Sequence, residues 1–218
     1  MGKVIEKEWN FIGEGNVPLV TDESGQPWVR KIVGAAPPTC QYASLGAGIG
    51  GVQCALTAAS QAQEVNLYWG DLLGIDVDQL LYFEWTFRFS TLLTGVAEAR
   101  IGLAGNYNAT PDDVAQNLWV KINSDETVDI ESDDGTTDTD DVSSGKSVAV
   151  STAYRVGFSF SEVGKSNIFV FWNQNDVRGE RIGHASTFSL NADTGSLQPY
   201  VHLLKAPGTG VGTVDILH

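Results

Sequence analysis

The chain has 218 residues, which is enough for one large sandwich or barrel, or for one domain with an arm. Its 27 acidic and 13 basic side chains give a formal net charge of −14, which opposes direct binding to the phosphates of DNA or RNA. A hydrophobic content of 42% can build a core, while 24 glycines and a single methionine favour a turn-rich β protein over a helical one.

The start of the chain carries several charges and no apolar run, so we expect no signal peptide there. No stretch of about 20 apolar residues occurs, so we expect no membrane-spanning segment and no membrane partner. These expectations place synthesis of the chain in the cytoplasm of its host.

Residues 1–62 show little periodicity and are predicted to form an irregular N-terminal arm with a few short strands. Glycine and proline separate its apolar segments, and one short helical turn is expected at 55–61. The aromatic side chains Trp9, Phe11 and Trp28 need a partner surface, either the main domain or another chain. We therefore predict that these three residues bind a partner.

Two cysteines, Cys40 and Cys54, lie within this arm. They could close a short loop as a disulfide, but two reduced thiols in a glycine-rich segment are the favoured interpretation. The sequence does not decide between the two states.

From residue 63 to 218 the sequence predicts one β-sandwich domain. In Leu81–Phe89, the residues Leu81, Phe83, Trp85, Phe87 and Phe89 share one face of a strand, and the polar residues between them share the other. Further strands are expected at 97–103, 117–123, 127–130, 154–160, 168–172, 186–190, 197–204 and 211–217. Only 111–116, with Thr110 as a plausible N-cap, has the pattern of a helix.

Residues 125–141 hold a third of all the acidic side chains and no basic one. We expect a long solvated loop at 133–141, because so many carboxylates cannot be buried unpaired. The segment does not match the ligand spacing of an EF-hand calcium loop, so we predict neither a metal nor another cofactor.

Sequence motifs that are typical of catalytic sites match this chain poorly. Gly46, Gly48 and Gly51 match G-x-G-x-x-G, but no buried strand precedes them. A glycosidase would need two facing carboxylates, for which Glu84 and Glu98 are the candidates. Single acids on an exposed sheet face are common, so we predict no catalytic residue and a protein that is not an enzyme.

Tryptophan side chains can stack on sugar rings. Trp85 and Trp172 alternate in phase with other apolar residues, so we assign them to the core. Trp69 and Trp119 are out of phase or near turns, so the sequence allows these two to be exposed.

The aromatic strand Leu81–Phe89, the strand 117–123 and the C-terminal segment 197–217 resemble the concanavalin A-like lectin/glucanase jelly roll, in the version found in structural proteins of tailed-phage particles. The resemblance covers residues 64–218 and implies an all-β, antiparallel two-sheet jelly-roll β-sandwich. The glucanase branch carries an E-x-D-x-x-E strand. Asp76-Val77-Asp78 lacks the glutamates of that pattern, which argues against hydrolysis.

The resemblance implies a decoration (cement) protein on the outer surface of a phage capsid. Its partners would be the major capsid protein and further copies of itself, for example in a trimer, with the arm clamping neighbouring subunits. The alternative is a carbohydrate-binding, lectin-like module of a tail fibre or secreted protein.

Overall fold

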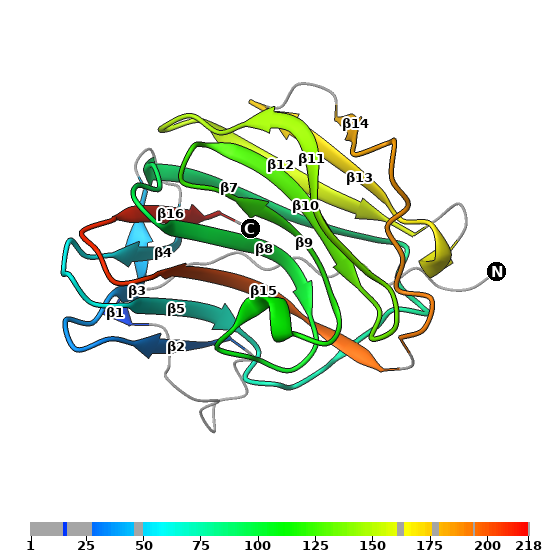
Figure 1. Cartoon of the computed structure of the whole chain (residues 1–218), viewed down its shortest axis with the longest axis horizontal. Coiled ribbons are helices and arrows are strands. Elements are labelled where there is room, and N and C mark those ends of the chain that lie inside the picture. Colours follow the sequence, from blue (N-terminus) through cyan, green and yellow to red (C-terminus); the bar gives the residue numbers. More distant parts are fainter. Residues whose placement is uncertain are drawn as a thin grey trace.

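The computed structural model describes residues 15–16, 28–45, 50–160, 164–175, 179–193 and 195–217. Within these ranges the chain consists of strands and two short 3₁₀ turns (Figure 1). The elements are β1 (Gly15–Asn16), β2 (Val29–Val33), β3 (Thr39–Ser44), β4 (Gly50–Leu56), β5 (Gln63–Tyr68), β6 (Ile75–Asp76), β7 (Tyr82–Thr91), β8 (Ala97–Ala104), η1 (Pro111–Asp113), β9 (Asn117–Ile122), β10 (Thr127–Asp133), β11 (Asp138–Ser147), β12 (Ala153–Ser159), η2 (Gly164–Ser166), β13 (Phe169–Gln174), β14 (Glu180–Ile182), β15 (Ser196–Lys205) and β16 (Gly212–Ile216).

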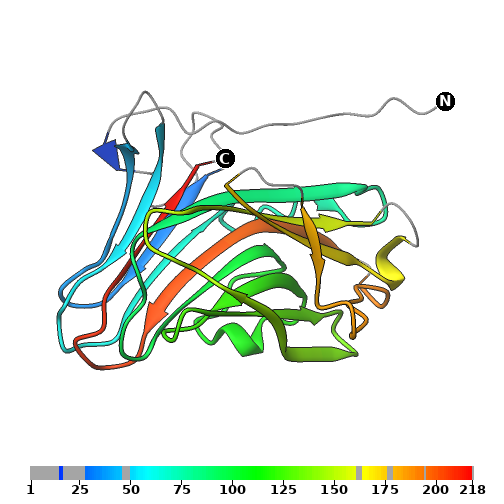
Figure 2. The same ribbon diagram turned by 90° about the horizontal axis from the view of Figure 1, so that it is seen from above.

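The strands form two sheets. Sheet A has the order β1-β3-β4-β16-β7-β12-β13-β14, and sheet B has the order β11-β10-β9-β8-β15-β5-β2, with β6 paired to one end of β15. Neighbouring named strands pair antiparallel throughout. In Figure 2, β7 and β12 of sheet A run along one side of the molecule and the strands β8–β10 of sheet B along the other. The predicted two-sheet antiparallel sandwich is confirmed.

The core lies between the sheets and follows the alternation of β7. Phe83, Trp85, Phe87 and Phe89 are buried in one apolar cluster with the inward side chains of sheet B. The indole Nε1 of Trp85 donates to the carbonyl of Gly102 on β8 at 2.9 Å, so a buried polar atom is satisfied across the sandwich.

Strands β2, β3 and β4 fall within the predicted arm 1–62 and are members of the two sheets. β2 pairs with β5 at one end of sheet B, and β4 pairs with the C-terminal strand β16 in sheet A. Their short apolar segments hid this role, because β2 and β4 are completed by partners distant in sequence. No helical turn forms at 55–61, since residues 55 and 56 end β4.

Two other expected elements also differ. The segment 111–116 forms only the 3₁₀ turn η1, with Pro111 at its start. The segment 186–190 forms no strand and contributes one isolated bridge, Ile168 to Phe188.

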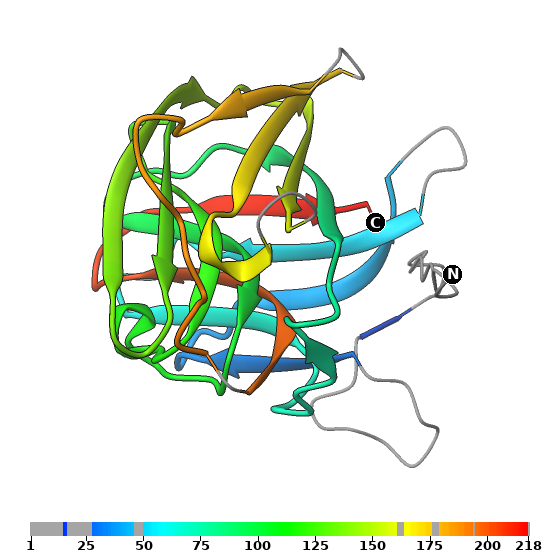
Figure 3. The same cartoon turned by 90° about the vertical axis from the view of Figure 1, so that its right-hand side faces the viewer.

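The acidic region is a β-hairpin, although its second half was expected to be a solvated loop. β10 and β11 pair from Thr127↔Ser147 to Asp133↔Asp138, with two register shifts. β11 lies at the edge of sheet B, where its acidic side chains face water. This edge lies beside β14 of sheet A (Figures 1 and 3), and Lys146 Nζ lies 2.6 Å from Glu180 Oε2 across the gap.

Lys205, at the end of β15, is buried although it carries a charge. Its ammonium group donates to the carbonyls of Thr57 (2.7 Å), Ala59 (2.6 Å), Gly208 (2.9 Å) and Gly210 (2.9 Å). One side chain therefore joins the loop after β4 to the loop before β16. Within the described residues, no helix has the length and apolar character needed to cross a membrane.

Candidate functional site

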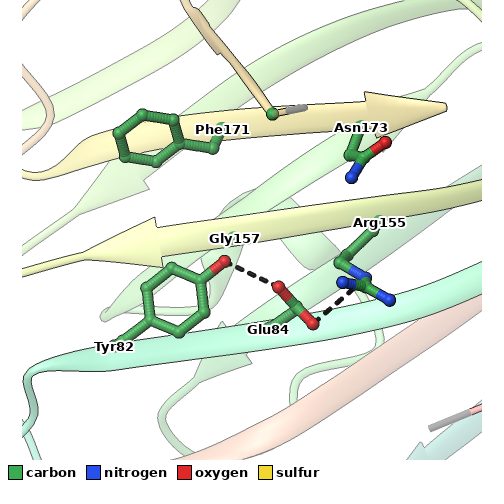
Figure 4. Close-up of a pocket in the computed structure, with 7 residues that line it drawn as sticks. Tyr82, Glu84, Arg155, Gly157, Phe171 and Asn173 are labelled. Carbon is green, nitrogen blue, oxygen red and sulfur yellow. Dashed lines mark hydrogen bonds and ion pairs between the residues drawn. The ribbon is translucent and has the colours of Figure 1, made fainter. Parts of the chain in front are cut away.

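The outer face of sheet A contains an open pocket of about 370 Å³. The pocket arises from strand register. Glu84 on β7 is paired with Gly157 on β12, and Gly157 with Phe171 on β13, so the residue without a side chain lies between two that project outward. We call this the Tyr82 pocket; its lining residues are Tyr82, Glu84, Arg155, Gly157, Phe171, Asn173 and Gly179 (Figure 4).

The ring of Tyr82 covers Gly157. A Cβ atom at position 157 would lie 2.0 Å from the Tyr82 hydroxyl oxygen, so only glycine leaves the ring in this place. The Tyr82 hydroxyl donates to Glu84 Oε2 at 2.7 Å. Burial and this hydrogen bond raise the pKa of Tyr82 above its usual range, so the hydroxyl stays protonated at neutral pH.

The charges of the pocket are paired. Glu84 Oε1 lies 3.2 Å from Arg155 Nε, and Figure 4 shows the carboxylate between the Tyr82 hydroxyl and the guanidinium. The two opposite charges leave the pocket close to neutral in a strongly acidic protein. Glu84 is the sole carboxylate among the described lining residues.

Asn173 supplies an acceptor. It pairs with Arg155 in the β12–β13 register and projects on the same face. Its Oδ1 atom is buried and has no hydrogen-bond partner among the described residues. The partly exposed ring of Phe171 lies on the same strand, two residues away. The pocket thus offers an aromatic surface beside a carboxylate, a guanidinium and an amide, which suits a ligand with both apolar ring faces and hydroxyl groups.

The outer face of sheet B, in contrast, is closed. Gly102 on β8 pairs with both Tyr200 on β15 and Trp119 on β9, whose rings stack at a centroid distance of 5.8 Å. Val114, from the segment 105–116 between β8 and β9, completes this cluster. Neither large ring has exposed surface, so this part of the face has no open binding site.

Charged groups surround this cluster. Arg100 is buried and contacts Asp112 at 2.6 Å and Glu131 at 3.4 Å, with Glu98 as a third carboxylate partner. Asp112 belongs to η1, so its ion pair helps to hold the segment 105–116 against the sheet. Three carboxylates therefore balance the charge of the buried guanidinium, which indicates a structural role for Arg100.

His202, on β15, belongs to this closed face. Its ring is fully buried, with Nε2 at 3.3 Å from Glu64 Oε1. Burial lowers the pKa of His202, which favours the neutral imidazole. We assign it to the packing of the sheet.

Of the predicted partner-binding residues, Trp9 and Phe11 lie outside the described residues. Trp28 is buried in the core of its own chain, where its ring meets Trp69 at 5.9 Å and Trp85 at 5.7 Å. Its ring is therefore not at the surface of this structure. Trp69 and Trp119, which the sequence allowed to be exposed, are both buried, because strands that are distant in sequence pair around them.

The two candidate acids of a glycosidase do not face one another. Glu84 lies on the outer face of sheet A, since its neighbours Phe83 and Trp85 point into the core. Glu98 lies on the outer face of sheet B, beside Arg100. The core separates them, so they cannot flank one glycosidic bond.

Comparisons with known proteins find no matching family model and no matching curated sequence. Solved structures do match. The lectin UEA-II in complex with galactose is 12% identical, with 96% of this chain and 94% of that chain covered and a TM-score of 0.54. A GH16 protein of a Bacteroides ovatus mixed-linkage glucan PUL, in complex with product, is 10% identical, with 91% and 97% covered and a TM-score of 0.53. The carbohydrate recognition domain of Emp46p, as a point mutant, is 13% identical, with 96% and 98% covered and a TM-score of 0.52. The chain therefore has the concanavalin-like lectin/glucanase jelly-roll fold.

Proposed function

We propose that this protein is a non-enzymatic carbohydrate-binding module and that the Tyr82 pocket is its sugar site. The observation that carries the proposal is the partly exposed ring of Phe171 two residues along β13 from Asn173, whose Oδ1 is a buried acceptor with no partner among the described residues. A sugar offers an apolar ring face for stacking and hydroxyl donors for such an acceptor. Two structural neighbours were solved with a sugar or glycan product, which supports this class of ligand.

A binding role fits the pocket better than hydrolysis. Hydrolysis by the usual mechanism needs two carboxyl groups about 5 to 10 Å apart. Glu84 is the sole acid among the described residues that line the pocket, and it is held by Tyr82 and Arg155. A carboxylate paired in this way can orient a hydroxyl group of a ligand.

The test is a glycan array followed by calorimetry on the full chain with the neutral oligosaccharides that bind. We expect Phe171→Ala and Asn173→Ala each to weaken binding by about tenfold or more, as loss of a central contact does. Phe169→Ala is the matched control: Phe169 is on the same face of the same strand but is covered by Arg181, 3.8 Å from its ring centroid, and does not line the pocket. Equal losses in Phe169→Ala and Phe171→Ala, or no glycan binding at millimolar concentration, would refute the sugar site.

The role on a phage capsid, with the major capsid protein as partner and the virion as location, stays a prediction. The fold neighbours described above favour the carbohydrate-binding alternative over it. Copurification of the chain with intact particles, at a fixed ratio to the shell subunit, would support the capsid role. A chain that binds glycans and is absent from purified particles would argue against it.

A further inference from the structure

Cys40 and Cys54 lie directly opposite one another. They are register partners on the antiparallel strands β3 and β4, and their Sγ atoms are 3.2 Å apart. Residues opposite one another in an antiparallel pair have Cα atoms about 4.5 or 5.5 Å apart, and both values fall within the roughly 4.4 to 6.8 Å that a disulfide spans. Small side-chain rotations would bring the two sulfurs to bonding distance without moving the strands.

The surroundings of the two thiols favour a disulfide between them over a metal site. Both side chains are fully buried in the core, and both thiols are free in this structure. A metal site would need further ligands, and no group of three or more histidine, cysteine or acidic side chains with that geometry occurs among the described residues. The guanidinium of Arg30 donates to the carbonyl of Cys40 at 3.1 Å, which fixes β3 against β2 and holds one cysteine in place.

We propose that Cys40 and Cys54 form a structural disulfide that links β3 to β4 when the chain folds in the presence of a disulfide oxidant such as oxidised glutathione. The thiolate of one cysteine attacks oxidised glutathione, forms a mixed disulfide and releases one reduced glutathione. The thiolate of the other cysteine then attacks the protein sulfur of that mixed disulfide and displaces the second glutathione. Two thiol protons and two electrons leave the protein, and one glutathione disulfide becomes two thiols.

The bond forms during folding and not afterwards. The contact with Cys40 and burial raise the pKa of Cys54, so the folded chain holds little of the reactive thiolate. The core also keeps small oxidants and reductants away from both sulfurs. Once formed, the disulfide is shielded in the same way, which makes it a lasting link and not a readily reversible switch.

The test is refolding of the full chain from urea in a mixture of oxidised and reduced glutathione. The product is then unfolded, alkylated with iodoacetamide and examined by mass spectrometry and peptide mapping. We expect a chain two hydrogens lighter, with no alkylated cysteine and with the peptides of Cys40 and Cys54 joined. The folded, reduced chain kept in the same mixture should retain two alkylatable thiols over the same period.

The variants Cys40→Ser and Cys54→Ser are the matched controls, and each should give an alkylated cysteine or a glutathione adduct. The oxidised chain should melt about 5 °C or more above the reduced chain, since the bond closes a short loop in the unfolded state. A refolded chain with native circular dichroism that keeps both thiols free, or that carries only glutathione adducts or links between chains, would overturn the proposal. If the chain does not refold from urea, the same alkylation is applied to chain translated in a cell-free system that contains the glutathione mixture, with the same criteria.

Discussion

Arg100 illustrates what a single buried charge requires. Its partner Glu98 is half-buried and Asp112 is largely exposed, but the side chain of Glu131 is only 3% exposed. Glu131 also accepts from the indole of Trp119 and lies 3.2 Å from Lys121 Nζ. The guanidinium and the Lys121 ammonium therefore together balance the acids on this face of sheet B.

Replacing Arg100 with methionine should lower the free energy of unfolding by about 3 to 5 kcal/mol, because Glu131 would stay buried with one basic partner fewer. Urea unfolding followed by tryptophan fluorescence measures the change. Lys146→Met is the control: its pair with Glu180 is solvent-exposed, and its loss should change stability by about 1 kcal/mol or less. Similar values for the two variants would mean that the Arg100 cluster balances its charge in another way.

Gly102 lies where β8 and β9 approach one another closely. A Cβ atom there would lie 2.2 Å from the backbone oxygen of Leu118 and 2.6 Å from the Cα of Trp119, so β8 and β9 would have to separate. We expect Gly102→Ala to lower the free energy of unfolding by about 1 to 3 kcal/mol, as overpacking does. The control is Gly179→Ala, whose Cβ would make an ordinary contact of 3.8 Å. Equal stability of the two variants would contradict the close approach of the strands.

At the scale of elements, the turn between β10 and β11 depends on one buried carboxylate. Asp134 Oδ1 accepts from the backbone N–H groups of Thr136 (3.0 Å) and Thr137 (2.8 Å), and Oδ2 accepts from Ala192 (3.1 Å). Burial raises the pKa of Asp134, but these three donors outweigh it, and the net pKa lies below its ordinary value. The hairpin is thereby joined to the loop before β15.

The lowered pKa of Asp134 determines how the stability of the folded chain changes with pH. Because folding lowers the pKa of Asp134, its stabilisation is complete above the unfolded value of about 3.9 and is lost as the pH falls through the folded value. Asp134→Asn should therefore be less stable than the parent chain near pH 7, and the difference should narrow below about pH 4. Urea midpoints across this range measure it, with the exposed Glu126→Gln as control. A constant difference at every pH would exclude a role for the ionised carboxylate.

The elements also show which patterns could be read from the sequence. β7 was predictable because one face is apolar and buried while the other is more polar and partly exposed, and the same holds for β12. β9 was predictable from the alternation of Leu118, Val120 and Ile122, although its other face is also covered. β11 could not be predicted in this way, since an edge strand with acidic residues on its exposed faces has no apolar alternation. β5 was missed for the opposite reason: its polar residues Glu64 and Asn66 are buried beside residues from β15 and the segment 105–116.

At the scale of the whole molecule, the fold class and the two-sheet arrangement were predictable, but the pocket was not. Its residues come from positions 82–84, 155–157, 171–173 and 179, and only the pairing of β7, β12 and β13 brings most of them together. The alternation did place Tyr82 and Glu84 on the wet face of β7. The register that sets Gly157 between Glu84 and Phe171 depends on contacts over about 70 residues of sequence, which no local pattern encodes.

The net charge of the whole molecule predicts which ligands it does not bind. With a formal charge of −14, the chain should not bind heparin or duplex DNA, even at low salt. Glycan binding at the Tyr82 pocket should change little between about 50 mM and about 500 mM NaCl, because Glu84 and Arg155 neutralise one another. Heparin chromatography and calorimetry at the two salt concentrations measure these outcomes. Tight binding of a polyanion would contradict this prediction.

The buried ammonium of Lys205 has a consequence for how the loops next to β4 and β16 respond to solution conditions. Four backbone oxygens surround it as they would surround a bound potassium ion, but this cation is covalently attached to β15. Dialysis cannot remove it, so replacing potassium with sodium in the buffer should leave the melting temperature unchanged. Lys205→Met leaves four inward carbonyls without their donor and should lower the free energy of unfolding by about 2 kcal/mol or more. Lys205→Gly should also lose stability, and added potassium should restore part of that free energy of unfolding by occupying the vacated space.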